Sequence, residues 1–268
     1  SLEFPRLFAP FWQSRRFYNT PSSLIKVASS VISRGSYFKR HIVSGELTYN
    51  VQTSERSMHQ FSPISLQYNY MTSHTAVFDS ILNANPYLKV TMKDVFIPKM
   101  RYSYIFNSPS RYRHPIWWQT TFSEASNLLS LAYMAAGKKW DEKDKTLFKN
   151  PFAHFFKIET DWRKTWKLNA HSQLVAHASA GAIWSYGNAT EAPYSEQFYV
   201  GGANSIRAFT ARSIGPGAYY PTASTNSYLD QTGDIKLLFN LEYRPRLIGS
   251  LYGAVFIDAG NVWAMHSS

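Results

Sequence analysis

The side chains best suited to ion-pair chemistry lie in one glycine-rich stretch, GGANSIRAFTARSIGPG, which spans residues 201–217. This stretch carries two arginines, Arg207 and Arg212, and no acidic residue. A guanidinium group presents five N–H donors in a fixed plane, so it can bind two carboxylates or a phosphate group. If the residues around it are ignored, Arg207 is better interpreted as an exposed loop arginine that lies near phosphate groups.

Other groups that could do chemistry have simpler explanations. His171 and His177 share one face of a predicted strand, but six residues of strand separate them by roughly 20 Å, too far for one metal ion. Glu159 and Asp161 resemble a catalytic acid pair, yet Lys157 and Arg163 flank them on the same face. We therefore expect charge compensation there. The sequence lacks the HExxH zinc motif, the nucleophile elbow and the phosphate-binding glycine loop. We predict no catalytic residues, no metal site and no cofactor.

The rest of the chain reads as alternating β-strands. In residues 40–51 and 64–70 apolar and polar side chains alternate with period two, which places them on opposite faces of a strand. Ten or eleven strands are predicted by this pattern, near residues 3–11, 23–34, 40–51, 62–71, 90–106, 115–122, 127–136, 152–164, 167–185, 234–246 and 250–264. The segments 52–61 and 72–89 are predicted to be polar connections, 163–167 a tight turn, and 137–151 a charged loop.

Two all-β architectures fit this alternation. A soluble barrel would point its apolar face inward, whereas a transmembrane barrel points it toward lipid and keeps polar residues in the lumen. The predicted strand that ends near Trp184 runs for roughly 17 residues, well beyond the usual five or six of soluble sheets. Its outward face is rich in alanine, and tryptophans such as Trp162, Trp166, Trp184 and Trp263 suit the interfacial girdles of a membrane protein. These features favour a transmembrane antiparallel β-barrel.

The same alternation places two acidic residues on the polar face of the last strands. Between residues 235 and 243 the odd-numbered residues form an apolar face, so Glu242 falls on the opposite face with Asn240. Between residues 251 and 259 the odd-numbered residues are again apolar, which puts Asp258 on the polar side. Parity alone therefore predicts that Glu242 and Asp258 both point into the lumen.

The segment FYVGGANSIRAFTARSIGPGAYYP, followed by DIKLLFNLEYRPRL and LYGAVFIDAGNVW, resembles the barrel of the BamA/TamA superfamily of outer-membrane assembly proteins, also called the bacterial surface antigen family. Within this superfamily, the segment resembles the TamA-like proteins of Bacteroidetes type (TamL). The family's V/I-R-G-F/Y motif corresponds to Ile206-Arg207-Ala208-Phe209. Ala208 departs from the glycine of that motif. Gly201 and Gly202 precede the motif, and Gly215 and Pro216 follow it.

This resemblance implies a site. The family's motif lies in a long extracellular loop that folds into the lumen, here residues 186–233, and inward-pointing acidic residues follow on the next two strands. We accordingly expect Arg207 to bind both Glu242 and Asp258, with Phe209 filling apolar space beside it. The glycines would supply backbone conformations and close approaches that side chains forbid.

The resemblance also implies domain organisation and function. Residues 1–268 would form part of one outer-membrane barrel domain, because the family's barrels have about sixteen strands, and no POTRA modules are visible in this sequence. The protein would insert or export envelope proteins at the bacterial outer membrane without being an enzyme. Its partners would be outer-membrane lipid and lipopolysaccharide, unfolded or nascent client proteins, and periplasmic or lipoprotein subunits. A passive porin or transporter and a soluble ligand-binding barrel are the alternatives.

Bulk composition is consistent with an envelope protein. The net charge of +11 is dispersed, since no Lys/Arg run exceeds two residues, and no nucleic-acid-binding motif accompanies it. Nucleic acid is therefore not an expected partner. The absence of cysteine excludes disulfides and thiol catalysis.

Overall fold

One large antiparallel sheet dominates the structure, a computed structural model that describes residues 1–6, 17–34, 37–84, 89, 92–109, 111–126, 146–147, 150–151, 153–186, 191–219 and 231–265. Eleven strands in this described part form the sheet, and they pair in sequence order as far as β11, which pairs with both β12 and β13. They are β1 (Leu2–Phe4), β2 (Ser22–Arg34), β3 (Phe38–Gln52), β4 (Ser57–His74), β5 (Val95–Asn107), β6 (Ile116–Ala125), β9 (Phe155–Lys167), β10 (Ser172–Ser185), β11 (Ile235–Ile248), β12 (Leu251–Tyr252) and β13 (Val255–Trp263). β7 (Thr146–Leu147) and β8 (Asn150–Pro151) form a separate pair.

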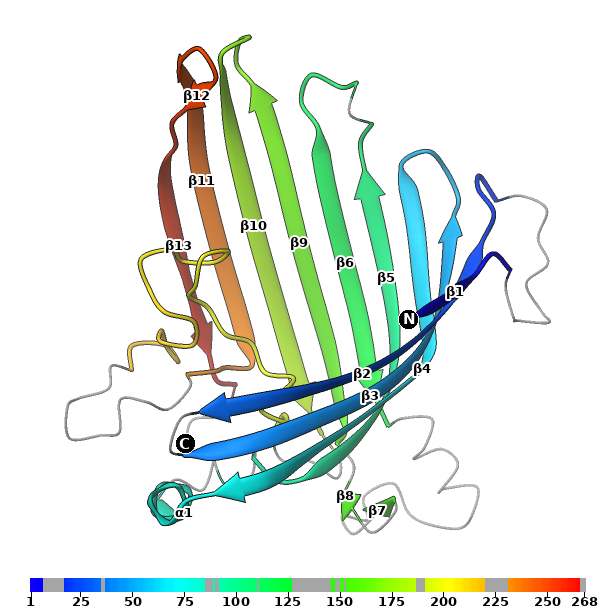
Figure 1. Ribbon diagram of the computed structural model, residues 1–268, viewed down its shortest axis with the longest axis vertical. Coiled ribbons are helices and arrows are strands. Elements are labelled where there is room, and N and C mark those ends of the chain that lie inside the picture. Colours follow the sequence, from blue (N-terminus) through cyan, green and yellow to red (C-terminus); the bar gives the residue numbers. More distant parts are fainter. Residues whose placement is uncertain are drawn as a thin grey trace.

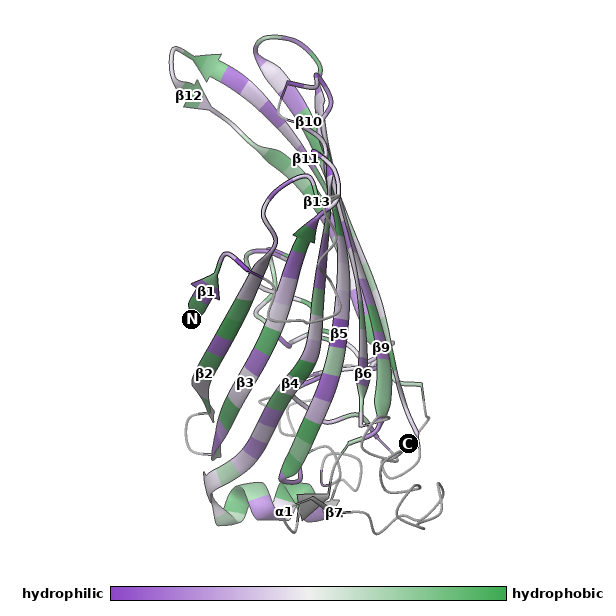
Figure 2. Cartoon of the chain, turned by 90° about the vertical axis from the view of Figure 1, so that its right-hand side faces the viewer, coloured by the Kyte–Doolittle hydropathy of each residue, from purple (hydrophilic) through white to green (hydrophobic). Residues whose placement is uncertain are grey.

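The sheet is curved, and its two faces differ in polarity. Figure 1 shows β2, β3 and β4 sweeping round from the remaining strands, so that the sheet curls about a concave side. Apolar side chains such as Leu237, Phe239 and Ile257 are exposed on the convex face. Hydropathy alternates along strands such as β3, β4 and β5 in Figure 2. The all-β fold and the alternation predicted from the sequence are confirmed. None of the helices in the described ranges is long and apolar enough to cross a membrane.

Several predicted element bounds were wrong. β4 begins at Ser57, so the connection predicted at 52–61 is only 53–56. β9 continues through the predicted turn at 163–167, because each of these residues pairs with β10. The strand predicted at 250–264 is divided between β12 and β13. Of the predicted strand at 3–11, only residues 3 and 4 lie in β1, and residues 7–11 lie outside the described residues. The predicted strand at 127–136 and most of the predicted loop at 137–151 lie outside the described residues.

Helix α1 (Ala76–Ala84) lies where a polar connection was predicted. Its apolar residues Phe78, Ile81 and Leu82 are spaced three and four residues apart, which places them on one helical face. Thr75 caps the first turn, since its hydroxyl accepts the Phe78 N–H at 3.4 Å. Phe78 and Ile81 pack with Phe38, Met92 and Tyr194 in a small buried cluster. The prediction failed because this short helical period lies among polar residues.

The main core lies inside the curve of the sheet at one end. Its buried residues come from the strands β5, β6, β9, β10, β11 and β13, from Ala153 and from the loop segment 192–206. They are Val95, Ile97, Ala125, Ala153, Phe155, Ile183, Ala192, Phe198, Val200, Ile206, Leu238 and Val262. Side chains on the inner face of the sheet are buried only where another segment packs over them, and residues 191–206 do so here. Side chains such as Leu238 and Ile183 are therefore apolar although they point to the otherwise polar inner face.

The connections differ between the two ends of the sheet. One end carries the connections 53–56, 108–115 and 168–171, whereas the opposite end carries 75–94, 126–154 and 186–234. The segment 191–219, yellow in Figure 1, enters the concave side from the second end.

Candidate functional site: a loop held inside the curve of the sheet

The segment 191–219 contacts the inner face of the sheet, and Arg207 makes its most extensive polar contacts. The Arg207 Nε and Nη2 atoms donate to the two carboxylate oxygens of Asp258, each at 2.8 Å. The Arg207 backbone N–H also donates to Asp258, at 3.1 Å. Nη1 donates to the carboxylate of Glu242. We call these contacts of Arg207 with Glu242 and Asp258 the Arg207 latch.

The sheet register explains why one guanidinium reaches both acids. Glu242 on β11 pairs with Phe256 on β13, and Asn240 on β11 pairs with Asp258, so the two acids are diagonal neighbours on one face. The side chains of Arg207, Glu242 and Asp258 are 26%, 14% and 5% exposed. Charge-assisted hydrogen bonds that are shielded from water to this degree are strong.

The surroundings keep the guanidinium charged and oriented. The hydrogen bond to Asp258 is the main cause that raises the pKa of Arg207 above its ordinary value; burial opposes it and the hydrogen bond to Glu242 adds to it. The ring of Phe256 lies 3.5 Å from the Arg207 Cζ atom, which is the distance of a cation–π contact. Glu242 also accepts from Arg244 on its own strand. The guanidinium is thus held in its plane by two acids and an aromatic face.

The other motif residues have different positions. Ile206 is 6% exposed and belongs to the main core. Phe209, expected to fill apolar space beside Arg207, is 52% exposed, so that expectation was wrong. Its backbone lies at the end of a turn formed by residues 202–209, which is closed by a hydrogen bond from the Gly202 N–H to the Phe209 carbonyl at 2.8 Å. This turn points the Phe209 side chain away from the core, and Ile206 fills the apolar space in its place. Ala208 is also exposed.

Two glycines of the motif lie where a side chain would not fit. Gly201 has a φ of +98°, and a Cβ atom there would lie 2.2 Å from the Thr210 carbonyl oxygen. Gly215 has a φ of +87°, and a Cβ atom there would lie 2.7 Å from the side chains of Asn261 and Val262 on β13. Gly202 is also in the left-handed region, and Pro216 follows Gly215. The segment therefore approaches β13 more closely than a substituted backbone could.

Arg212, for which the sequence offered no partner, stacks on two tyrosine rings. Its Cζ atom lies 4.8 Å from the ring centroid of Tyr194 and 4.1 Å from that of Tyr199. The backbone of Arg212 has a φ of +64°, and its N–H donates to the Val200 carbonyl at 3.0 Å. Tyr194 belongs in turn to the small cluster beneath helix α1. Arg212 therefore connects its own part of the loop to residues 194–200 and, through Tyr194, to the small buried cluster beneath helix α1.

A second polar anchor, which the sequence reasoning missed, involves Glu196. This buried carboxylate accepts from the Lys99 ammonium at 2.6 Å, and the Lys157 ammonium lies 3.8 Å away. Lys157 also donates to the Glu196 carbonyl at 2.9 Å. Burial raises the pKa of Glu196, but the charges of Lys99 and Lys157 outweigh it and leave the pKa below its ordinary value. The only sequence signal was an acidic loop residue that could meet lysines on the inner face.

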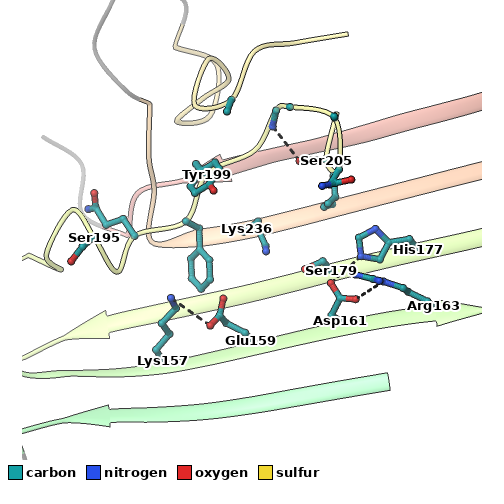
Figure 3. A pocket seen from close by; sticks show the side chains of 18 residues that line it. Lys157, Glu159, Asp161, Arg163, His177, Ser179, Ser195, Tyr199, Ser205 and Lys236 are labelled. Carbon is teal, nitrogen blue, oxygen red and sulfur yellow. Dashed lines mark hydrogen bonds and ion pairs between the residues drawn. The ribbon is translucent and has the colours of Figure 1, made fainter. Parts of the chain in front are cut away.

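A polar groove separates the loop from the sheet wall. It has a volume of about 520 Å³ and runs between β9, β10 and β11 on one side and residues 195–205 on the other. In Figure 3 the charged residues of its wall lie in adjacent pairs: Lys157 with Glu159, and Arg163 with Asp161. The charge compensation predicted there is confirmed. No group of three potential metal ligands occurs within the described ranges.

Comparisons with known proteins place this geometry in a family. Residues 110–268 match the Omp85 superfamily domain. The fold resembles the crystal structure of BamA from Haemophilus ducreyi lacking POTRA domains 1–3, with a TM-score of 0.62 and 15% sequence identity. The match covers 91% of this chain and 46% of that chain, so this chain spans about half the length of that protein. The chain therefore belongs to the Omp85 superfamily and is a bacterial outer-membrane protein with an antiparallel β-barrel fold.

Proposed function

We propose that this protein is an outer-membrane assembly or translocation factor that inserts or exports envelope proteins and is not an enzyme. The observation that carries the proposal is the Arg207 latch, in which a loop arginine bridges acids on two adjacent strands of an Omp85 superfamily domain. The narrower assignment to TamA-like proteins of Bacteroidetes type stays a prediction.

A physical argument connects the Arg207 latch with this function. A barrel that passes strands into the membrane has to open part of its own sheet, and an open edge exposes unpaired backbone groups that can template an incoming strand. The remaining wall has to stay intact meanwhile. The Arg207 latch ties β11, β13 and the loop together with short charge-assisted bonds, so this part of the wall resists opening.

The orientation in the membrane is part of the proposal. Outer-membrane barrels have short periplasmic turns and longer extracellular loops. The end of the sheet that carries residues 75–94, 126–154 and 186–234 would then face outside, toward lipopolysaccharide. The end with the connection 168–171 would face the periplasm, where nascent client proteins and any lipoprotein subunits arrive.

The test is an Arg207→Ala substitution in the full-length protein. We expect a lower thermal stability of the folded barrel and a reduced level of surface proteins, because Glu242 and Asp258 would face each other without a shared cation. Arg207→Lys should lower barrel stability and surface protein levels almost as much as Arg207→Ala, since an ammonium group cannot form the bidentate contact with Asp258. Arg111→Ala, at an exposed turn arginine, is the control and should change neither readout.

The result also separates this proposal from the alternatives. If Arg207→Ala leaves barrel stability and surface protein levels unchanged and alters only ion conductance, the protein is a passive porin or transporter. The soluble ligand-binding barrel does not fit a chain that belongs to the Omp85 superfamily and lies in the outer membrane.

A further inference from the structure

His177 on β10 bonds to an acceptor through each of its two ring nitrogens. Nε2 lies 2.9 Å from Oδ2 of Asp161 on β9, and Nδ1 lies 2.8 Å from Oδ1 of Asn240 on β11. Figure 3 shows the imidazole above Asp161 and Arg163 at one end of the polar groove. The His177 side chain is only 16% exposed, so bulk water contributes little to its hydrogen bonding.

The orientation of the Asn240 amide follows from its other contacts. Its Nδ2 atom donates to the Ser205 carbonyl oxygen at 2.7 Å and to Oδ1 of Asp258 at 2.8 Å. Both of these partners can only accept, since one is a carbonyl oxygen and the other a carboxylate oxygen. The NH2 group of Asn240 must therefore face the loop and Asp258. Its oxygen is left facing His177.

Both ring nitrogens of His177 consequently need a hydrogen atom. A neutral imidazole carries one N–H and one lone pair, whereas the imidazolium carries two N–H groups. With Asp161 on one side and the Asn240 oxygen on the other, only the imidazolium makes both hydrogen bonds. We infer that protonated His177 is a positioning residue for the Arg207 latch: it holds the Asn240 amide, which in turn holds Asp258 and the Ser205 backbone.

The charged groups around His177 decide how the network responds to pH. Asp161 is in direct contact and favours the imidazolium, while Arg163 binds the same carboxylate at 3.2 Å and opposes it. From β11, Lys236 lines the same groove as His177, and Glu242 lies on the same face of the sheet. From the loop and β13, Arg207 and Asp258 form a pair whose charges largely cancel. Asp161 is the only one of these charges that touches the ring.

Loss of the proton would alter the Arg207 latch through Asn240. A neutral His177 that keeps its hydrogen on Nε2 retains Asp161, but its Nδ1 lone pair then faces the Asn240 oxygen. Repulsion between two acceptors favours a rotated amide, and rotation removes the NH2 group from Asp258 and from the Ser205 carbonyl. Histidine changes its charge between about pH 5 and 8. The network is therefore complete with the imidazolium and lacks one donor when the imidazole is neutral.

This inference rests on the proposed role of the Arg207 latch, but its test does not require assembly activity. Hydrogen exchange of the segment 202–209 is measured by mass spectrometry on the full-length protein in lipid, between pH 5 and 8, after correction for intrinsic exchange rates. We expect protection to fall by about tenfold as the pH rises, which corresponds to the loss of one shielded hydrogen bond. His177→Gln should give a flat profile, because glutamine does not titrate.

The control is His171→Gln, at an exposed histidine in the turn immediately before β10, which should reproduce the wild-type profile. A flat wild-type profile, or an unchanged pH dependence in His177→Gln, overturns the inference. If His177→Gln does not fold, the nitrogen-15 chemical shifts of the wild-type imidazole at acidic pH test the proposal instead. An unprotonated ring nitrogen would contradict it.

Activity then separates the two proposals. Normal surface protein levels in Arg207→Ala together with a His177-dependent exchange profile would refute the proposed function alone. Loss of surface proteins in Arg207→Ala together with a flat exchange profile would refute only the role of His177.

Discussion

The ring of Phe198, on the loop, occupies the space that a side chain at Gly181 would need. A Cβ atom built on Gly181 would lie 2.5 Å from the Cζ atom of Phe198. The same ring lies 4.6 Å from the Lys157 ammonium and 5.5 Å from that of Lys236, as measured to the ring centroid. The inner face of β10 accepts the loop at this point because residue 181 has no side chain.

Gly181→Ala should therefore displace the loop and destabilise the barrel by about 1–3 kcal/mol, the usual cost of overpacking. The measurement is the free energy of unfolding in urea, together with hydrogen exchange of residues 195–206. Gly45→Ala on β3 is the control, because a Cβ atom there would meet nothing within 4 Å. Equal stabilities of the two variants would contradict the close approach of Phe198.

The Arg207 latch can be tested by a double-mutant cycle between Arg207→Ala and Asp258→Ala. Their side chains share two hydrogen bonds that both substitutions remove, so we expect a coupling energy of about 1–3 kcal/mol in urea unfolding. A cycle between Arg207→Ala and Glu55→Ala, an acid at the opposite end of the sheet, should give no coupling. A coupling below about 0.5 kcal/mol between Arg207 and Asp258 would argue against the bridge.

Glu196 should make the loop sensitive to acid. Its pKa in the folded protein is below the ordinary value of 4.5, so its stabilising contribution is complete above that value and is lost as the pH falls through the lowered pKa. Glu196→Gln should destabilise the barrel by about 3 kcal/mol at neutral pH, since Lys99 and Lys157 would keep their buried charges without the carboxylate. The variant should also lose less stability than wild type between neutral pH and pH 3.

Glu55→Gln provides the control for Glu196, because Glu55 is an exposed turn residue paired with Arg111. It should change stability by less than about 0.5 kcal/mol. If Glu196→Gln behaved in the same way as this control, the second anchor would be excluded.

Arg212 should depend on its planar guanidinium. Arg212→Lys keeps the charge but loses the flat surface that stacks on Tyr194 and Tyr199, so we expect a loss of about 0.5–2 kcal/mol. Arg111→Lys is the control, because Arg111 is exposed and its Cζ atom lies 5.9 Å from the centroid of the Tyr112 ring, farther than Arg212 lies from either of its tyrosines. Hydrogen exchange of residues 198–213 should increase only in Arg212→Lys. Unchanged exchange would show that the two rings do not hold the loop.

Much of the wall of this barrel could be predicted from the sequence. Strand alternation is a local property, since successive residues point to opposite faces of the sheet whatever the partner strand is. For this reason parity correctly placed Asn240, Glu242 and Asp258 on the inner face. Helix α1 and the continuation of β9 through residues 163–167 were missed, because short polar stretches carry too little periodicity to mark an element's type or end.

The sequence by itself determined which face of each strand is polar and which loop carries the arginine. The tertiary structure decided what the loop covers. Leu238 and Ile183 are apolar on the polar face, and Glu196 is buried between two lysines, because a segment distant in sequence excludes water there. Phe209 is exposed while Ile206 is buried, because the direction of a turn depends on where its ends are bound. Alternation is set by neighbouring residues, whereas burial and ion pairing depend on contacts between residues far apart in the chain.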